Sequence, residues 1–238
     1  MKNKKSIIVT IVVAIILIIS VTLVIFLHAI PAHNRRKQIE LANKLHMQYT
    51  AEKLAKYAQE NELYADYEID IAFLGDSLTD GYDVENFYPQ YKVVNRGIGG
   101  DRTYNLKDRI SVSAYDLKPK VVVMLIGANN FDTMFNDYED IVQGLKTNLT
   151  DTKIVLLSLT AMSGEHWGKN NSIACLNNVK IELIAEKYGC TFVDLFTPLF
   201  DLHTNGLYSE FTTDGGHLNQ AGYVKVTSIL TPVLENLL

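Results

Sequence analysis

Three residues of the chain have the types and spacing needed for nucleophilic attack by a hydroxyl group: Ser77, Asp214 and His217. A serine hydroxyl is a poor nucleophile at its ordinary pKa, so it needs an adjacent base. His217 is the best candidate for that base, and it lies in a polar, glycine-containing turn at residues 213–219. Asp214 precedes it by three residues, close enough to bond the second ring nitrogen and fix its tautomer. The pattern predicts nucleophilic catalysis at Ser77.

Attack by a serine on an acyl carbon forms an oxyanion, which needs preorganised hydrogen-bond donors. The backbone N–H groups of Ser77 and Gly100 and the side-chain amide of Asn129 would supply three such donors. Each has a plainer explanation as well. The glycines at 97, 99 and 100 could form only a tight turn, and Asn129 could cap a helix. A phosphate-binding loop is disfavoured, because no Gly-Lys-Ser/Thr sequence follows the glycines.

Several further polar or aromatic residues are candidates for contact with a substrate. Loops that follow the strands of a sheet commonly shape the binding pocket, and one such loop spans residues 162–171. For Asp76 and Asp101 we expect helix capping or bracing of the site rather than proton transfer. The other histidines show no spacing that makes a metal site, so no metal or cofactor is expected. The possible substrate contacts are Asp76, Asn130, His166 and Trp167.

Short apolar runs alternate with helical patterns from residue 69 onwards, which predicts an α/β fold with a doubly wound parallel sheet covered on both sides. In such sheets, ligands bind outside the carboxyl ends of the strands. The polar segments 75–80, 95–102 and 127–130 each follow a predicted strand and would meet at one edge. The predicted strands are 69–74, 91–95, 121–126, 153–159 and 191–195, and the predicted helices are near 104–116, 138–149, 171–188 and 219–237.

Four blocks in this order resemble the SGNH, or GDSL-type, hydrolase family over residues 69–238. They are Gly75-Asp76-Ser77-Leu78, the glycine segment ending at Gly100, Gly127-x-Asn129 and Asp214-x-x-His217. The resemblance implies Ser77 as nucleophile, His217 as base, Asp214 as its orienter, and Gly100 with Asn129 in the oxyanion hole. It also implies a flavodoxin-like three-layer fold of about five strands in the order 2-1-3-4-5.

One position departs from the family pattern: the third block usually ends in Asp, where this chain has Asn130. The residues of the second and third blocks are most similar to those of the platelet-activating-factor acetylhydrolase branch of the family. That branch favours short acyl groups, although proteins that share a fold differ widely in substrate.

The N-terminal part of the chain carries a membrane signal. Residues 7–27 are an unbroken run of 21 residues with only three polar members. As a helix this run would measure roughly 31 Å, which matches the ~30 Å hydrocarbon thickness of a bilayer. A cleaved signal peptide is the alternative, but no A-x-A site follows the run. Basic residues flank both ends, and those before the run lie nearer to it, which favours a cytoplasmic N-terminus and an extracytoplasmic domain.

The expected organisation is an N-terminal transmembrane anchor (1–31), a helical stalk or linker (32–68) and a hydrolase domain (69–238). Residues 34–64 contain no Pro or Gly and are rich in helix formers, which predicts a spacer helix lying against the domain. Its candidate packing positions are Ile39, Leu41, Leu45, Leu54 and Tyr57. Cys175 and Cys190 would lie roughly 20 Å apart if a helix joins them, too far for a disulfide, so two free and mostly buried thiols are expected.

Charge excludes one class of partner. The chain has a net charge of −5, and residues 38–238 hold 16 basic and 27 acidic side chains. A nucleic-acid-binding domain would carry the opposite sign. Three hypotheses remain: a membrane-anchored serine esterase acting on a lipid or carbohydrate ester, an acyltransferase using the same residues, and a non-catalytic anchored binding module. Neither the acyl group, the alcohol nor the oligomeric state follows from the sequence.

Overall fold

The computed structural model describes residues 2–238, with side chains described at residue 10, at residues 13–27 and from residue 30 onwards. Contacts divide the chain into two compact units, Met1–Glu52 and Lys53–Leu238. The predicted membrane span at 7–27 falls in the first unit, and its side chains at 7–9, 11 and 12 lie outside those described.

The first unit is helical. It contains α1 (Lys2–Val24), the π-helical turn η1 (Ile25–Ala29) and the start of α2 (Ile30–Asn61). Its described large apolar side chains are exposed; Phe26, for example, is 67% exposed. One helix near the N-terminus is long and apolar enough to cross a membrane. Of the candidate packing positions, Tyr57 is buried and Leu54 is half-buried, both in the second unit, whereas Ile39, Leu41 and Leu45 are exposed in the first.

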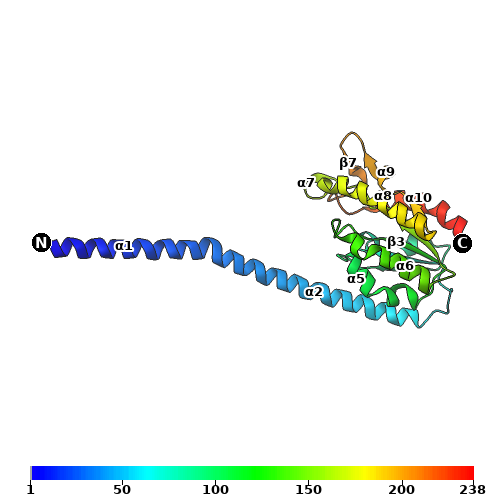
Figure 1. The fold of residues 1–238 in the computed structure, drawn as a ribbon, viewed down its shortest axis with the longest axis horizontal. Coiled ribbons are helices and arrows are strands. Elements are labelled where there is room, and N and C mark those ends of the chain that lie inside the picture. The colour runs from blue at the N-terminus through cyan, green and yellow to red at the C-terminus, as the bar shows by residue number, and fades with distance from the viewer. Residues whose placement is uncertain (1) are drawn as a thin grey trace. The chain divides into compact units, whose positions relative to one another are not determined.

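The second unit contains the predicted doubly wound parallel sheet (Figure 1). Its strand order is β2-β1-β3-β4-β5, the order that the family resemblance implied. All residues of β1 and β3 are buried, as expected for interior strands that are covered on both faces. The strands are β1 (Ile71–Gly75), β2 (Val93–Gly97), β3 (Val121–Leu125), β4 (Lys153–Leu157) and β5 (Thr191–Val193).

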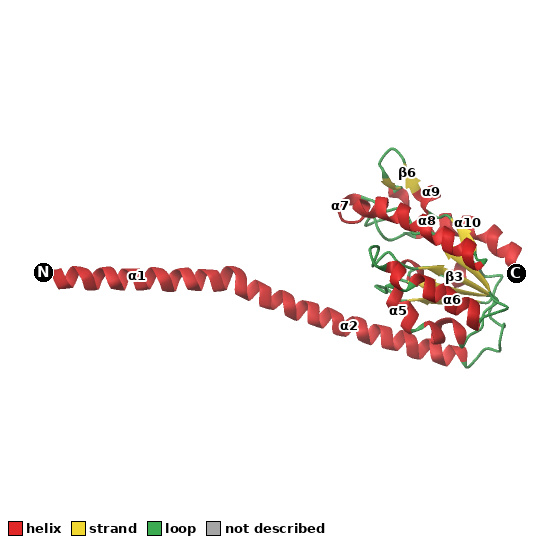
Figure 2. Cartoon of the chain, viewed as in Figure 1, coloured by secondary structure: helices red, strands yellow, loops and turns green. Residues whose placement is uncertain are grey.

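Helices cover both faces of the sheet (Figure 2). Helix α6 contacts both α5 and α8, and α8 packs on β4 and β5. Near α10, the Tyr223 ring stacks on Tyr82, whose ring meets Phe73 of β1 edge-on. The helices are α3 (Ser77–Asp80), α4 (Val84–Phe87), α5 (Thr103–Asp108), α6 (Tyr138–Asn148), α7 (Gly164–Trp167), α8 (Asn171–Tyr188), α9 (Phe196–Leu199) and α10 (Gln220–Leu237). A small hairpin of β6 (Phe200–Asp201) and β7 (Gly206–Leu207) follows α9.

The register of the sheet brings the chemistry-bearing loops together. Gly75, the last residue of β1, pairs with Gly97 at the end of β2 and with Leu125 at the end of β3. The segments that follow these three strands therefore leave the sheet at one level. Because β2 and β3 lie on opposite sides of β1, this level is also the point where strand order reverses, where doubly wound sheets bind ligands.

Three sequence expectations need correction. The helix predicted near 104–116 is interrupted: α5 ends at Asp108 and a π-helical turn, η2, spans Ser111–Tyr115. We attribute the break to Arg109, whose buried guanidinium makes four hydrogen bonds to groups inside the domain. Strand β2 spans Val93–Gly97, whereas the prediction was 91–95. It is an edge strand, so polar Asn95 can lie within it and stay half-buried.

The third correction concerns the thiols. Both cysteines are free, but Cys175 is exposed and Cys190 is half-buried. Cys175 lies on the outer face of α8 beside Leu176, which is 66% exposed, so this face of the helix packs against nothing in the described part of the chain.

Candidate active site

Ser77 begins the short helix α3, directly after β1. The preceding residue, Asp76, caps this helix and accepts a hydrogen bond from the Leu78 N–H at 3.1 Å. Gly75 ends the strand, and a Cβ atom there would lie 2.2 Å from the Leu125 carbonyl oxygen and from the Thr79 hydroxyl. Only glycine therefore allows α3 to turn back so closely against β3, which fixes the position of the Ser77 side chain.

The structure brings Ser77, His217 and Asp214 into one chain of hydrogen bonds. The Ser77 Oγ atom lies 3.0 Å from His217 Nε2, and His217 Nδ1 lies 2.6 Å from Asp214 Oδ2. If Nδ1 carries the proton, His217 donates to Asp214 and its Nε2 is free to accept the serine proton. This is the arrangement that a nucleophilic serine requires.

The turn that carries His217 is held by its own polar groups. Asp214 Oδ1 accepts the backbone N–H groups of Gly216 at 2.9 Å and His217 at 2.8 Å. The Thr212 hydroxyl donates to the His217 carbonyl at 2.6 Å and accepts the N–H of Gly215, whose φ is +85°. The His217 backbone is thus bonded on both sides. The role of Thr212 was not predicted, although its position two residues before Asp214 makes such a turn possible.

Hydrogen bonding also sets the charge of Asp214. Partial burial opposes ionisation, but the hydrogen bonds from the His217 side chain and from the His217 and Gly216 backbone outweigh it. Together they hold the pKa of this carboxyl well below its usual range. Asp214 is therefore an anion at neutral pH, and it can stabilise a positive charge on His217.

The expected oxyanion donors lie on the loops after β1, β2 and β3. Asn129 lines the same pocket as Ser77 and His217, and its Nδ2 donates one hydrogen bond to the Asp101 carbonyl at 2.9 Å. Because the amide has a second N–H, one donor is left for a ligand. Gly100 has a φ of +83°, and its N–H has no acceptor in the part of the chain that the structure describes.

The pocket beside Ser77 is small and largely apolar. Its cavity measures about 20 Å³. Gly216 packs directly on Trp167, since a Cβ atom at Gly216 would lie 2.7 Å from the indole ring. The Trp167 ring also meets the His217 ring edge-on, with centroids 5.7 Å apart. The lining residues are Ser77, Leu78, Ala128, Asn129, Leu159, Thr160, Met162, Trp167, Gly216 and His217.

Three of the four possible substrate contacts lie outside this lining. Asn130 instead braces the loop, because its side-chain amide donates to the Thr103 hydroxyl at 2.9 Å and accepts the Thr103 N–H at 3.3 Å. His166 is exposed and contacts the Trp167 ring from the outside. Asp76 is buried beneath α3. Trp167 alone of the four lines the pocket.

Asp76 is an unusual carboxyl group. It is 1% exposed, and its Oδ2 atom has no hydrogen-bond partner in the described structure. Burial raises the pKa of Asp76 to about 7, with the nearby Asp101 carboxylate raising it further and the Leu78 and Gly127 N–H groups opposing the shift. Its contacts are those of a helix cap, as expected from the sequence.

A buried arginine that was not predicted from the sequence joins the strand ends. The Arg109 side chain donates to Asp101 Oδ2 at 2.7 Å, to the Arg96 carbonyl at 2.9 Å and to the Gly75 carbonyl at 3.0 Å. It therefore ties together the segments that carry Ser77 and Gly100. The sequence did hold an indication of this role, because Arg109 shares a helical face with the apolar Leu106. A buried arginine is rare unless it is paired, so that position predicts polar partners for Arg109.

Two asparagines that were also missed hold one wall of the pocket. Asn171 pairs through both atoms of its amide with the backbone of Met162, at 2.9 and 2.7 Å. Seven residues later, Asn178 pairs in the same way with Leu159, at 2.8 and 3.1 Å. Each amide accepts from the N–H and donates to the carbonyl of one residue, as a neighbouring strand would. Helix α8 thereby fixes the segment between Leu159 and Met162. The sequence signal for them was two asparagines two turns apart on the helix face that also carries Ala174, Ile181 and Ala185.

Comparison with known proteins agrees with this geometry. The sequence profile of the GDSL-like lipase/acylhydrolase family matches residues 73–225, a span that includes Ser77, Asp214 and His217. The chain belongs to the GDSL-like lipase/acylhydrolase family. Family membership makes it an ester hydrolase, as the sequence motifs predicted.

Among curated proteins, this GDSL-like hydrolase is similar to the platelet-activating factor acetylhydrolase IB subunit alpha2 of Homo sapiens. The two are 29% identical over 184 residues, which cover 73% of this chain and 79% of the human one. The rat protein of the same name is 28% identical, with the same coverage of both chains.

Among solved structures, the GDSL-like hydrolase is similar to a Streptococcus pneumonia protein provisionally named a platelet activating factor. That match has a TM-score of 0.69 and 26% identity, and covers 84% of this chain and 99% of the other. A GDSL-like lipase from Bacteroides thetaiotaomicron shares the fold with a TM-score of 0.68 at 24% identity, covering 78% and 98%. An acetylxylan esterase from Geobacillus stearothermophilus also shares the fold, with a TM-score of 0.60 at 19% identity, covering 71% and 95%.

Proposed function

We propose that this ester hydrolase works through an acyl-enzyme on Ser77 and removes short acyl groups, such as acetyl, from a lipid or a carbohydrate. The observation that carries the proposal is the chain of hydrogen bonds from Ser77 through His217 to Asp214, at 3.0 and 2.6 Å. It supplies a nucleophile, a base and an anion that orients the base, beside a pocket with a small cavity.

In the first half of the reaction, the Ser77 oxygen attacks the ester carbonyl and its proton passes to His217 Nε2. The ionised Asp214 stabilises the imidazolium that results. The carbonyl oxygen becomes an oxyanion, and the N–H groups of Ser77, Gly100 and Asn129 Nδ2 stabilise it. When the tetrahedral intermediate collapses, the bond to the alcohol breaks and His217 returns its proton to the leaving alcohol oxygen.

In the second half, water takes the place of the alcohol. His217 accepts a proton from that water, the hydroxide attacks the acyl carbon of the Ser77 ester, and the same donors stabilise the second oxyanion. Collapse releases the carboxylic acid and returns the proton to the Ser77 oxygen. No other group is required in either half of this scheme.

Two observations support a short acyl group. The cavity beside Ser77 measures about 20 Å³, little more than the space that one water needs. Trp167 limits it on one side, packed against Gly216. The curated relatives at 28–29% identity carry the name acetylhydrolase, which agrees with a pocket of this size.

We further propose that the apolar helix near the N-terminus anchors the enzyme in a membrane, with the catalytic unit on the extracytoplasmic side. Support comes from the length of the apolar run at residues 7–27 and from the lysines that precede it. Extraction of cell membranes with alkaline carbonate tests the anchor, since an integral protein stays in the pellet. Protease added to intact cells tests the side, since an extracytoplasmic domain is digested.

The proposed reaction is tested with the detergent-solubilised full chain and nitrophenyl esters of acetate, butyrate and octanoate. We expect kcat/KM to be highest for acetate and to fall with chain length, and we expect the Ser77→Ala variant to be inactive on all three. Turnover that persists in Ser77→Ala would exclude the serine mechanism. A preference for octanoate would contradict the assignment of a short acyl group. Acyl transfer to an added alcohol in place of water would favour an acyltransferase.

A further inference from the structure

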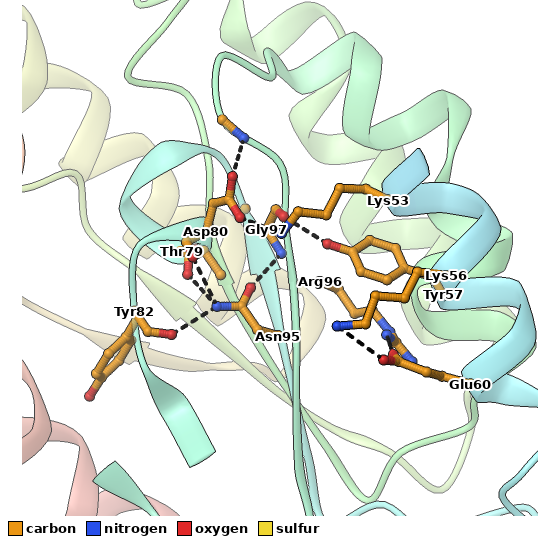
Figure 3. A network of polar contacts seen from close by, with 12 residues as sticks. Lys53, Lys56, Tyr57, Glu60, Thr79, Asp80, Tyr82, Asn95, Arg96 and Gly97 are labelled. Carbon is orange, nitrogen blue, oxygen red and sulfur yellow. Dashed lines mark hydrogen bonds and ion pairs between the residues drawn. The ribbon is translucent and has the colours of Figure 1, made fainter. Parts of the chain in front are cut away.

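The last two turns of α2, residues 53–61, bond directly to the loop that carries the proposed oxyanion donor. The Tyr57 hydroxyl donates to the Gly97 carbonyl at 2.8 Å, and its ring is 1% exposed (Figure 3). Gly97 is the last residue of β2, three residues before Gly100. The hydroxyl therefore fixes the point from which the Gly97–Gly100 loop leaves the sheet.

A second contact joins the same loop to the helix of the nucleophile. Asp80 lies at the end of α3, which Ser77 begins. Its Oδ2 atom accepts the Gly99 N–H at 2.9 Å, and its Oδ1 atom lies 2.6 Å from Lys53 Nζ (Figure 3). The Asp80 carboxylate thus sets the distance between α3 and the loop, and Lys53 of α2 balances its charge.

The fit between α3 and the loop leaves no spare room. A Cβ atom at Gly97 would lie 2.3 Å from the Asp80 nitrogen, and a Cβ atom at Gly99 would lie 3.3 Å from Asp80 Oδ2. A small shift of the loop therefore changes where the Gly100 N–H points relative to Ser77. The cost of such a shift falls on the oxyanion, because preorganised donors act only at the correct position.

An ion pair between the buried Arg96 and the half-buried Glu60 holds α2 in place for this task. Arg96, the residue before Gly97, is fully buried and pairs with Glu60, and its Nη2 atom donates to Asn61 Oδ1 at 2.9 Å. The Arg96 guanidinium also lies 4.5 Å above the centre of the Tyr57 ring. A partly buried pair of this kind fixes geometry more than it adds stability, because desolvation of Arg96 offsets much of the attraction.

We propose that Lys53 and Tyr57 of α2 are positioning residues of the active site, which hold the Gly97–Gly100 loop so that the Gly100 N–H meets the oxyanion on the substrate. This inference rests on the proposed acyl-enzyme mechanism. It also makes residues that the sequence pattern assigned to a stalk part of the catalytic unit, in agreement with the compact unit that begins at Lys53.

Positioning and simple structural support predict different kinetics. An oxyanion donor interacts more strongly with the transition state than with the bound ester, so its displacement lowers kcat and leaves KM unchanged. Loss of support for the fold instead lowers the amount of active enzyme. Titration of active serine with a fluorophosphonate corrects every rate for that amount, so kcat refers to folded enzyme alone.

The test compares Tyr57→Phe with Tyr64→Phe in the full chain, using nitrophenyl acetate. Tyr64 is a half-buried tyrosine close by in the sequence, and no side-chain hydrogen bond is found for it in the described structure. We expect kcat of Tyr57→Phe to fall about tenfold, the effect of roughly one hydrogen bond, with KM and the Tyr64→Phe rate unchanged. Equal kcat in Tyr57→Phe and wild type, or an equal fall in both variants, would overturn the inference.

A second pair keeps the inference testable if Tyr57→Phe fails to fold. Lys53→Met should lower kcat and Lys53→Arg should restore most of it, whereas Lys44→Met, at an exposed position of the same helix, should leave it unchanged. Unchanged kcat in Lys53→Met would overturn the inference. Failure of the proposed mechanism gives a different result: the wild-type enzyme would then neither turn over nor react with the fluorophosphonate at Ser77.

Discussion

The Ser77 hydroxyl lies 3.0 Å from His217 Nε2 although 140 residues separate the two along the chain. Ser77 reaches this position because Gly75 lets α3 close against β3. His217 reaches it because Asp214 and Thr212 bond its turn from both sides. Neither side chain belongs to the hydrophobic core, so substitutions at these two positions test the contact without disturbing the core.

The base is tested with His217→Ala. We expect kcat on nitrophenyl acetate to fall to the background rate, because the Ser77 proton then has no acceptor. The melting temperature should stay within about 2 °C of wild type, since surface substitutions have small effects. A large loss of stability would show that His217 supports the fold instead.

The oxyanion site is tested with Asn129→Ala. We expect kcat to fall ~10²–10³-fold, the usual cost of one such donor. Asn130→Ala is the comparison variant: it removes the bond to Thr103 that braces the loop but no residue of the pocket lining, so kcat should fall much less. An unaffected rate in Asn129→Ala would remove this amide from the mechanism.

The pocket wall is tested with Trp167→Ala. Removing the indole enlarges the cavity beside Ser77, so octanoate esters should gain kcat/KM relative to acetate esters. His166→Ala, which removes an exposed neighbour outside the lining, should leave the chain-length profile unchanged. If both profiles match wild type, Trp167 does not limit the acyl group.

Asp76 predicts a pH dependence of stability. Burial raises the pKa of Asp76 to about 7, from 3.8 when exposed. Between these values the unfolded chain has released a proton that the folded one retains, so the free energy of unfolding falls as pH rises through this window. Asp76→Asn cannot ionise and should lose this slope. Its melting temperature relative to wild type should therefore be higher at about pH 8 than at about pH 5.

The Asp76→Asn measurement has its own control. The variant leaves one new amide hydrogen without a partner, but that cost is the same at every pH and cancels in the comparison. A difference in melting temperature that stays constant with pH would mean that Asp76 does not titrate in this window.

The parts of the site that follow from local sequence were predictable. The segments that follow the strands indicated Ser77, Gly100 and Asn129 by residue type and position. The three-residue spacing of Asp214 and His217 predicted that the two side chains would pair. Parallel strands then place all of these segments at one edge. The resemblance to a known family added the strand order, which β2-β1-β3-β4-β5 confirms.

The parts that depend on long-range contacts were not predictable. The buried partners of Arg96, Arg109 and Asn178 lie on other elements, and a single sequence does not say which ones. The sequence predicted that Tyr57 packs against the domain, but not that its hydroxyl bonds Gly97 or that Lys53 bonds Asp80 beside the site. Asn130 was expected near the substrate, but its side chain bonds Thr103 and braces the loop instead.

The most direct test of the central claim is to trap the acyl-enzyme. The full chain is mixed with nitrophenyl acetate, quenched in acid within the first turnover and digested for mass spectrometry. We predict one acetyl group on the peptide that contains Ser77, absent from Ser77→Ala and persisting longer in Asn129→Ala. Turnover without an adduct at Ser77, or an adduct on another residue, would contradict the proposed mechanism.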